Sequence, residues 1–272
     1  MASSATDSQG SDKDIREKLV KTGHVDVMIS VGNNFFYTKS LPCSLWFLDK
    51  GKAENLRNKV LFIDARDYYT VIDRTLNEWN EWQLKNMNAI VWLYRGEIDK
   101  YKKLLEEYRS TVANMIAKTG EDKLNAVKDD VFLNGLEVAK KHLKSIREAA
   151  KKAVEACDRK EKKQIQYSWD KKIAAIEEIV EVVKEAHWLY SKFGEGKYED
   201  ILGLCKIADI ETIENKGWSL TPGAYVGVAP MEDDGVDFAQ RMAEIHQELL
   251  SLQAESNDLM DTISKNMEEM GL

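Results

Sequence analysis

The middle of the chain carries apolar residues at helical spacing along three long stretches. Steps of three and four residues recur over 84–115, 132–157 and 165–190. This spacing places the apolar side chains on one face of a helix. Helices of roughly 30 residues are about 45 Å long. Three of them joined by short links predict an extended helical bundle with coiled-coil-like seams.

Composition supports this prediction and excludes several classes of protein. Charged residues make up 32% of the 272 residues, and the 15 glycines and 3 prolines are few, which favours helices over loops. Cys43, Cys157 and Cys205 are far apart and lack a cysteine or histidine at zinc-ligand spacing. We therefore expect neither a disulfide framework nor a metal site. No apolar run has membrane-spanning length, so we expect a cytoplasmic protein without membrane contact.

Residues 24–64 interrupt the helical pattern with short β-like runs. Two of them, 24–31 and 42–48, flank a sequence that contains Phe35, Phe36 and Tyr37. This arrangement predicts an antiparallel pair of strands that presents aromatic side chains at one end, followed by a third strand over 59–64. Such side chains could stack on a planar ligand, including a nucleobase. The alternative, which is more common for aromatic residues, is a place in the core or in an interface.

Further elements are expected on either side of the helical stretches. Residues 14–21 predict a short helix, and 71–83 predict a helix with two tryptophans on one face. Two short helices are expected over 198–206 and 209–215, and an extended piece over 225–228.

Charge is distributed unevenly along the chain, whose net charge is −8. Residues 140–172 contain 12 basic and 5 acidic residues. One group of basic residues repeats at helical spacing and could contact DNA phosphates; the alternative is a solvated helix surface. The group consists of Lys140, Lys141, Lys144, Arg147, Lys151 and Lys152.

The last 42 residues, 231–272, contain 11 acidic and 2 basic residues and predict one amphipathic helix. Its apolar seam either docks on the chain's own bundle or binds a helix of a partner. The seam is formed by Phe238, Met242, Ile245, Leu249, Leu252, Leu259 and Ile263.

Five segments resemble, in the same order, the modification (methyltransferase) subunits of type I restriction-modification systems, which are N6-adenine DNA methyltransferases. The resemblance covers the later part of that subunit. It departs from the family at Ala224, where an arginine is frequent, which makes a phosphate contact there doubtful. The segments are residues 36–50, 60–66, 91–97, 203–208 and 218–228.

The resemblance implies a function for the parent protein. It would methylate adenine N6 in DNA with S-adenosylmethionine, together with a specificity subunit, a second methyltransferase subunit and a restriction subunit. In related methyltransferases an aromatic side chain stacks on the flipped-out adenine. Phe35 or Phe36 occupies that place here, and Phe35 is favoured. The C-terminal seam would bind the specificity subunit.

The chain itself contains neither a glycine-rich loop after a strand nor adjacent prolines, because Pro42, Pro222 and Pro230 are all isolated. The family places its cofactor loop and its Asn/Asp-Pro-Pro-aromatic motif upstream. We therefore expect no catalytic, cofactor-binding or metal-binding residue in this chain and no activity in isolation. The alternatives are a stand-alone helical adaptor and a truncated modulator of the methyltransferase complex.

The predicted fold class is mainly α, with a small antiparallel β remnant of a methyltransferase sheet at the N-terminal end. Four parts are expected. Residues 1–13 form a disordered linker, 14–67 a remnant of the catalytic core, 68–230 a helical assembly domain, and 231–272 an acidic coiled-coil-type helix.

Overall fold

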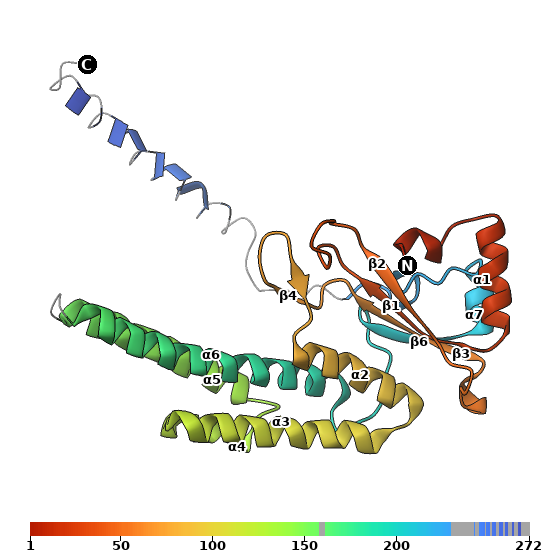
Figure 1. The fold of residues 1–272 in the computed structure, drawn as a ribbon, viewed down its shortest axis with the longest axis horizontal. Helices are drawn as coiled ribbons and strands as arrows, with labels where there is room; N and C mark the ends of the chain where they lie inside the picture. Colours follow the sequence, from red (N-terminus) through yellow and green to blue (C-terminus); the bar gives the residue numbers. More distant parts are fainter. Residues whose placement is uncertain are drawn as a thin grey trace. The chain divides into compact units, whose positions relative to one another are not determined.

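The computed structural model describes residues 1–157 and 161–229, together with short runs of one to three residues between 242 and 267. Residues Met1–Ala229 form one compact unit, and Pro230–Leu272 form a second unit that is considered separately. The larger unit contains short 3₁₀ turns and the following elements (Figure 1): α1 (Ser11–Lys21), β1 (Val25–Val31), β2 (Cys43–Leu48), β3 (Lys59–Ala65), β4 (Thr70–Val71), β5 (Asn77–Glu78), α2 (Glu81–Arg95), α3 (Ile98–Thr119), α4 (Asn125–Asp129), α5 (Gly135–Ala156), α6 (Lys162–Phe193), β6 (Cys205–Asp209), α7 (Ile210–Asn215) and α8 (Gly223–Val226).

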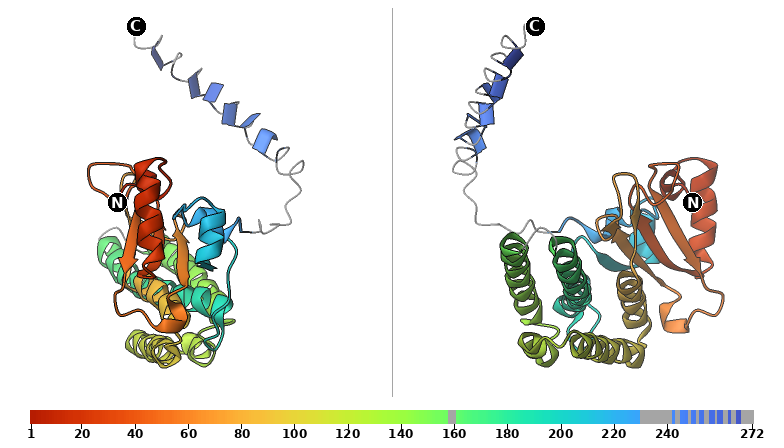
Figure 2. Two further views of the ribbon diagram at one scale, coloured as in Figure 1. Left: turned by 90° about the vertical axis from the view of Figure 1, so that its right-hand side faces the viewer. Right: turned by 60° about the vertical axis from the view of Figure 1, so that its left-hand side comes forward.

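A four-stranded sheet of order β2-β1-β3-β6 lies at the centre of the larger unit. The central strand β1 is rich in β-branched residues and is buried at all seven positions. Met28 and Phe62 face a small core formed with α1, α7 and α8. Ile29 and Ile63 face the main core, which is shared with the long helices. Helices therefore cover both faces of the sheet (Figure 2).

The sheet is mixed, so the prediction of an antiparallel remnant is wrong in this detail. β1 and β2 are antiparallel, as predicted, but β3 runs parallel to β1. β6 adds a fourth, antiparallel strand on the other side of β3. This strand replaces part of the short helix predicted over 198–206. β6 is hydrogen-bonded to β3, which is more than 130 residues away in the sequence. The local sequence around 205–209 therefore does not indicate this pairing.

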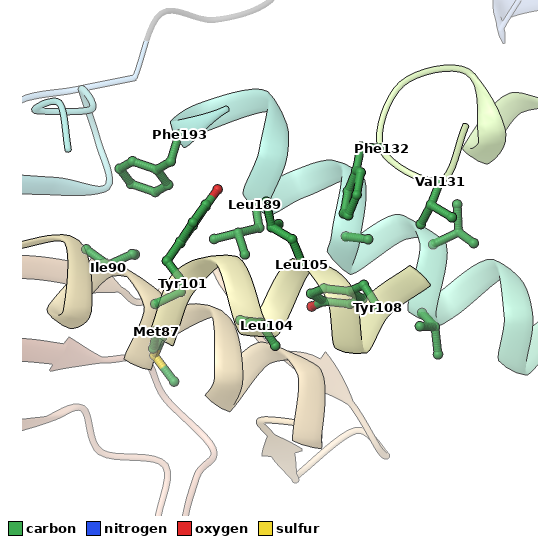
Figure 3. Packing of buried hydrophobic residues seen from close by; sticks show 14 of the residues in the cluster. Met87, Ile90, Tyr101, Leu104, Leu105, Tyr108, Val131, Phe132, Leu189 and Phe193 are labelled. Atoms are coloured by element: carbon green, nitrogen blue, oxygen red, sulfur yellow. The ribbon is translucent and has the colours of Figure 1, made fainter. Parts of the chain in front are cut away.

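The long helices come between β3 and β6, two neighbouring strands of the sheet. α5 and α6 pack against each other as an antiparallel pair, and α3 packs on α6 (Figure 2). Tyr101 and Tyr108 of α3 are fully buried. Figure 3 shows these two side chains among leucines of α3 and residues that include Leu189 and Phe193 of α6. The expected helical bundle is present.

The seam over 84–115 is divided between two helices instead of lying on one. α2 ends at Arg95, and the capping residue Gly96 has a left-handed conformation with φ 76°. The amide of Glu97 donates to the carbonyl of Trp92, which closes a Schellman motif. Because a glycine has no Cβ, it adopts this conformation without strain, and the chain turns there into α3.

Residues 71–83 form a β-hairpin and the start of a helix, and not the predicted single helix. β4 and β5 pair across a short turn. The Asn80 side chain accepts from the Gln83 amide, and the Gln83 side chain accepts from the Asn80 amide. This capping box starts α2 at Glu81. The predicted extended piece at 225–228 is also wrong, since Gly223–Val226 is a short helix.

A buried ion pair fixes the end of α2 against the sheet. Asp26 in β1 is buried and is paired with Arg95 of α2 and with Lys52. Lys52 also donates to the carbonyl of Val25 at 2.6 Å. Its buried position makes Asp26 costly to leave unpaired, so this contact favours one docking geometry of α2.

In the C-terminal unit, the described residues between 242 and 267 are in helical conformation. Among the described residues of the chain, no helix is long and apolar enough to cross a membrane. The same residues contain no cluster of side chains suited to hold a metal ion.

Candidate functional site

The loop between β1 and β2 carries the aromatic residues singled out from the sequence. Asn34, directly before these aromatic residues, has a left-handed conformation with φ 64°. The Phe35 ring packs on Trp79 at a centroid distance of 4.8 Å and on Tyr69 at 6.0 Å. Phe36 and Tyr37 are 47% and 89% exposed. Phe35, which the sequence favoured for stacking, is thus engaged within an aromatic cluster, while Phe36 and Tyr37 offer free surface.

An open groove lies beside Phe36 along the edge strand β2. Its volume is about 780 Å³, and Leu41, Pro42 and Cys43 contribute to its lining. At this edge of the sheet, residue Ala2 forms an isolated bridge with Cys43. The Ser44 amide donates to the Met1 carbonyl at 2.9 Å. Within the described part of the chain, the outer edge of β2 is therefore paired at its first residues and open beyond them.

The carboxyl ends of the parallel strands β1 and β3 are closely packed. A Cβ atom on Gly32 would lie 2.6 Å from the Arg66 carbonyl oxygen. The Arg66 guanidinium donates to both oxygens of Asp64, at 2.8 and 2.6 Å. Nucleotides bind at this end of an open α/β sheet when a crevice exists there. Here backbone and an ion pair fill the space, so these residues do not fit a nucleoside cofactor.

A buried polar cluster connects the segment after β3 with three helices. The Tyr68 hydroxyl donates to a carboxylate oxygen of Glu185 at 2.5 Å, and the Tyr68 ring stacks on Trp188 at 4.0 Å. Asn86 donates to the Tyr68 hydroxyl and accepts from the Tyr108 hydroxyl, both at 2.9 Å. Glu185 is 1% exposed. Burial raises the pKa of its carboxyl group.

The polar cluster also reaches the aromatic loop. The Trp79 indole donates to the Tyr68 carbonyl at 2.7 Å, and the Trp79 ring packs on Phe35. The Asn80 side chain donates to Glu181 of α6 at 3.2 Å. A continuous series of contacts therefore runs from α6 to the loop that carries Phe35.

The basic group predicted on one helix lies on the exposed side of α5. Two of its members are paired: Lys140 with Glu137 at 3.5 Å, and Arg147 with Glu177 at 2.6 Å. The other four make no ion pair with any residue that the structure describes. They are Lys141, Lys144, Lys151 and Lys152.

The predicted partner seam lies in the C-terminal unit. Phe238 is outside the described residues. The other six members, Met242 to Ile263, are described as helical and are between 40% and 63% exposed. Leu250 and Met260, which adjoin the seam, are also exposed.

Several residues around the loop were not predicted from the sequence. Tyr69 and Trp79 belong to the aromatic cluster, and Glu185, Gln83 and Asn86 form the polar cluster. Trp79 is one of the two tryptophans in the helix predicted over 71–83. A buried glutamate in a helix with many charged residues carries no local signal.

Comparisons with known proteins show which proteins this chain resembles. Residues 1–119 match the N-6 DNA Methylase family. The chain is 24% identical over 271 residues to the type I restriction enzyme MjaIX methylase subunit of Methanocaldococcus jannaschii, covering all of this chain and 31% of that protein. It is 40% identical over 91 residues to the HindI methylase subunit of Haemophilus influenzae, covering 34% of this chain and 20% of that protein.

The chain is thus a relative of the type I restriction enzyme methylase subunits, and the resemblance found in its sequence motifs is confirmed. It spans about a third or less of the length of these curated relatives. A crystal structure of a type I methyltransferase subunit from Streptococcus thermophilus is 14% identical, with a TM-score of 0.37, and covers 84% of this chain and 25% of that one.

The buried position of Glu185 predicts a pH-dependent contribution to stability. Because its pKa is raised above the ordinary glutamate value of 4.5, the stability it contributes is present below that value and is lost as pH rises toward the raised pKa. Glu185→Gln keeps an acceptor for Tyr68 and cannot ionise. We expect the free energy of unfolding of this variant, relative to the native chain, to increase between pH 4.5 and pH 8.

Urea unfolding at several pH values measures this difference. The matched control is Glu178→Gln, an exposed glutamate on the same helix, for which we expect a much weaker pH trend. A Glu185→Gln difference that stays constant with pH would contradict the role assigned to burial.

Proposed function

We propose that this chain is the later part of a type I methylase subunit that methylates adenine N6 in DNA with S-adenosylmethionine. It would act in the cytoplasm with a specificity subunit, a second methylase subunit and a restriction subunit. The proposal is supported by the match to the N6 methylase family and by the motifs in family order. The structural observation that carries it is the exposed aromatic pair, Phe36 and Tyr37, beside an open sheet edge.

The chemistry of adenine methylation gives the aromatic loop a role. An exocyclic amine inside a duplex is out of reach, so the base must leave the stack, and an aromatic side chain replaces the lost stacking. The Phe35 ring already packs on Tyr69 and Trp79, so it is not free to stack on a base. We therefore assign the stacking role to Phe36 and the support of the loop to Phe35, which revises the order of preference drawn from the sequence.

The open edge of β2 suggests where the rest of the subunit joins. An unpaired strand edge is a template for a further strand. We propose that a strand from the remainder of the subunit continues the bridge that Ala2 begins with Cys43. S-adenosylmethionine, which supplies the methyl group when bound, would be held by that remainder, because the ends of β1 and β3 do not fit it.

Loss of the stacking surface should lower methylation. In the intact subunit assembled with its partners, we expect Phe36→Ala to reduce kcat/KM by about tenfold or more, since stacking of one base on an aromatic side chain is worth about 1–3 kcal/mol. Phe36→Trp should retain most of the activity. Transfer of a labelled methyl group to a duplex with one target site measures this.

The control for that experiment is Tyr167→Ala, because Tyr167 on α6 is an exposed aromatic residue outside the loop and the open sheet edge. We expect it to keep near-native kcat/KM. Equal losses in Phe36→Ala and Tyr167→Ala would remove the specific stacking role from Phe36.

We also propose that the seam of the C-terminal unit binds a helix of the specificity subunit. Its six described apolar residues are exposed, and such a stripe gains free energy when a partner covers it. Leu249→Asp combined with Leu259→Asp would place two charges on the seam. We expect this double variant to lose co-purification with the specificity subunit.

A double variant beside the seam provides the matched control. Leu250 and Met260 follow the two leucines directly and are 54% and 61% exposed. Leu250→Asp combined with Met260→Asp should retain the partner, because a shift of one position turns a side chain about 100° around a helix. Retained binding by the seam variant would refute the assignment of this surface.

The basic face of α5 is proposed to contact the DNA backbone in the assembled enzyme. Each phosphate contact adds about 0.9 to the slope of log affinity against log salt. Reversing charge at Lys144, Arg147 and Lys151 should flatten that slope by about two to three. The same reversal at Lys100, Lys102 and Lys103 of α3, which are also exposed, should change it little. An unchanged slope in the α5 variant would reject the contact.

A further inference from the structure

The β4–β5 hairpin is a small projecting element with a rigid tip. The amides of Ile72 and Asp73 both donate to the Leu76 carbonyl, at 3.0 and 3.2 Å. The Asp73 carboxylate accepts from the amide and from the hydroxyl of Thr75, at 2.6 and 2.8 Å. These bonds lower the pKa of Asp73 and hold its charge within the turn. The tip is therefore ordered by its own hydrogen bonds.

The side chains that this tip presents are apolar and cationic. Val71 and Ile72 are 64% and 49% exposed. Arg74, in the turn of the hairpin, is also exposed and forms no ion pair with the residues that the structure describes. Two exposed aliphatic side chains on so small a hairpin have nothing within it to cover them.

The hairpin is fastened to the loop that carries the aromatic residues. The Asn77 amide donates to the Asn34 carbonyl at 2.7 Å, and the Asn77 side chain donates to the Asn33 carbonyl at 3.0 Å. Trp79, directly after β5, packs on Phe35. Figure 1 shows the hairpin and the β1–β2 loop extending from the same end of the sheet. The base of the hairpin is thus fastened to the start of the loop.

We propose that the β4–β5 hairpin contacts duplex DNA beside the target base, with Ile72 as an apolar wedge at the opened base step and Arg74 as a backbone contact. This inference rests on the proposed function of the β1–β2 loop. A base that leaves the stack opens a gap, and proteins that deform DNA fill such gaps with aliphatic side chains. A two-stranded ribbon is narrow enough to enter the major groove.

Duplex DNA fits this hairpin better than a protein partner for two reasons. The hairpin is bonded through Asn77 to the start of the loop assigned to the flipped base, so a duplex bound at that loop is the macromolecule nearest to the hairpin. Arg74 of the hairpin lacks an ion-pair partner among the described residues and lies next to the apolar side chains in the sequence. This arrangement is expected for a wedge that enters between phosphate backbones.

Base flipping can be followed with 2-aminopurine at the target position, whose fluorescence rises when it leaves the stack. The intact methylase subunit, assembled with its specificity subunit, should raise this fluorescence. At saturating protein, Ile72→Ser should reduce this fluorescence rise by a factor of about three or more, because the opened base step loses its wedge. Ile15→Ser, which alters an exposed isoleucine of α1, should match the native protein. Arg74→Ala should lower the salt slope of DNA binding by about one.

The outcomes separate the two proposals. If the native assembly neither methylates DNA nor raises the fluorescence, the proposed function fails, and this inference fails with it. If the native assembly flips the base and Ile72→Ser behaves identically, the wedge alone is refuted. If Ile72→Ser instead loses the specificity subunit in co-purification, the hairpin is a protein-docking element, which also overturns the DNA contact.

Discussion

The arrangement of this protein depends on a carboxyl group that is buried where the sheet meets the long helices. Glu185 accepts from Tyr68, which follows β3, and its helix is held to α2 through Asn86. Removing one member would leave buried polar groups without partners, and such groups cost more than a lost surface contact. A network of this kind favours one relative placement of its helices over other apolar packings. It thereby fixes the path of the chain from β3 into α2.

That path determines where the candidate site lies. The same segment that passes the polar cluster forms the β4–β5 hairpin, and Asn77 bonds that hairpin to the β1–β2 loop. Phe35 is held by residues on both sides of the hairpin, Tyr69 before it and Trp79 after it. Two elements that would each be mobile alone are thus mutually braced. This bracing leaves Phe36 exposed on a supported backbone, as a stacking surface requires.

The sequence predicted elements where local pattern and final environment agree. The runs over 24–31 and 42–48 became β1 and β2, and the helical seams became helices. β6 was missed because only its pairing with β3 defines it. Glu185 was missed because the buried face of α6 is wider than the apolar seam traced over 165–190. Val182, Ala186 and Leu189 are buried beside that seam, and Glu185 lies among them. For the site, the loop was predicted correctly as an aromatic tip between two strands, but the division of roles between Phe35 and Phe36 depends on Trp79.

The position of the long helices between β3 and β6 has an evolutionary consequence. These strands are neighbours, with Ile63 opposite Cys205, so the helical segment leaves and re-enters the sheet about one strand spacing apart, roughly 5 Å. A segment whose two ends lie so close can be inserted into a sheet at a small entropic cost that depends only weakly on its length. The close spacing of its two ends therefore lets the helical part change in length without moving β3 and β6 apart, while the residues that anchor it, Arg95 and Glu185 among them, stay constrained.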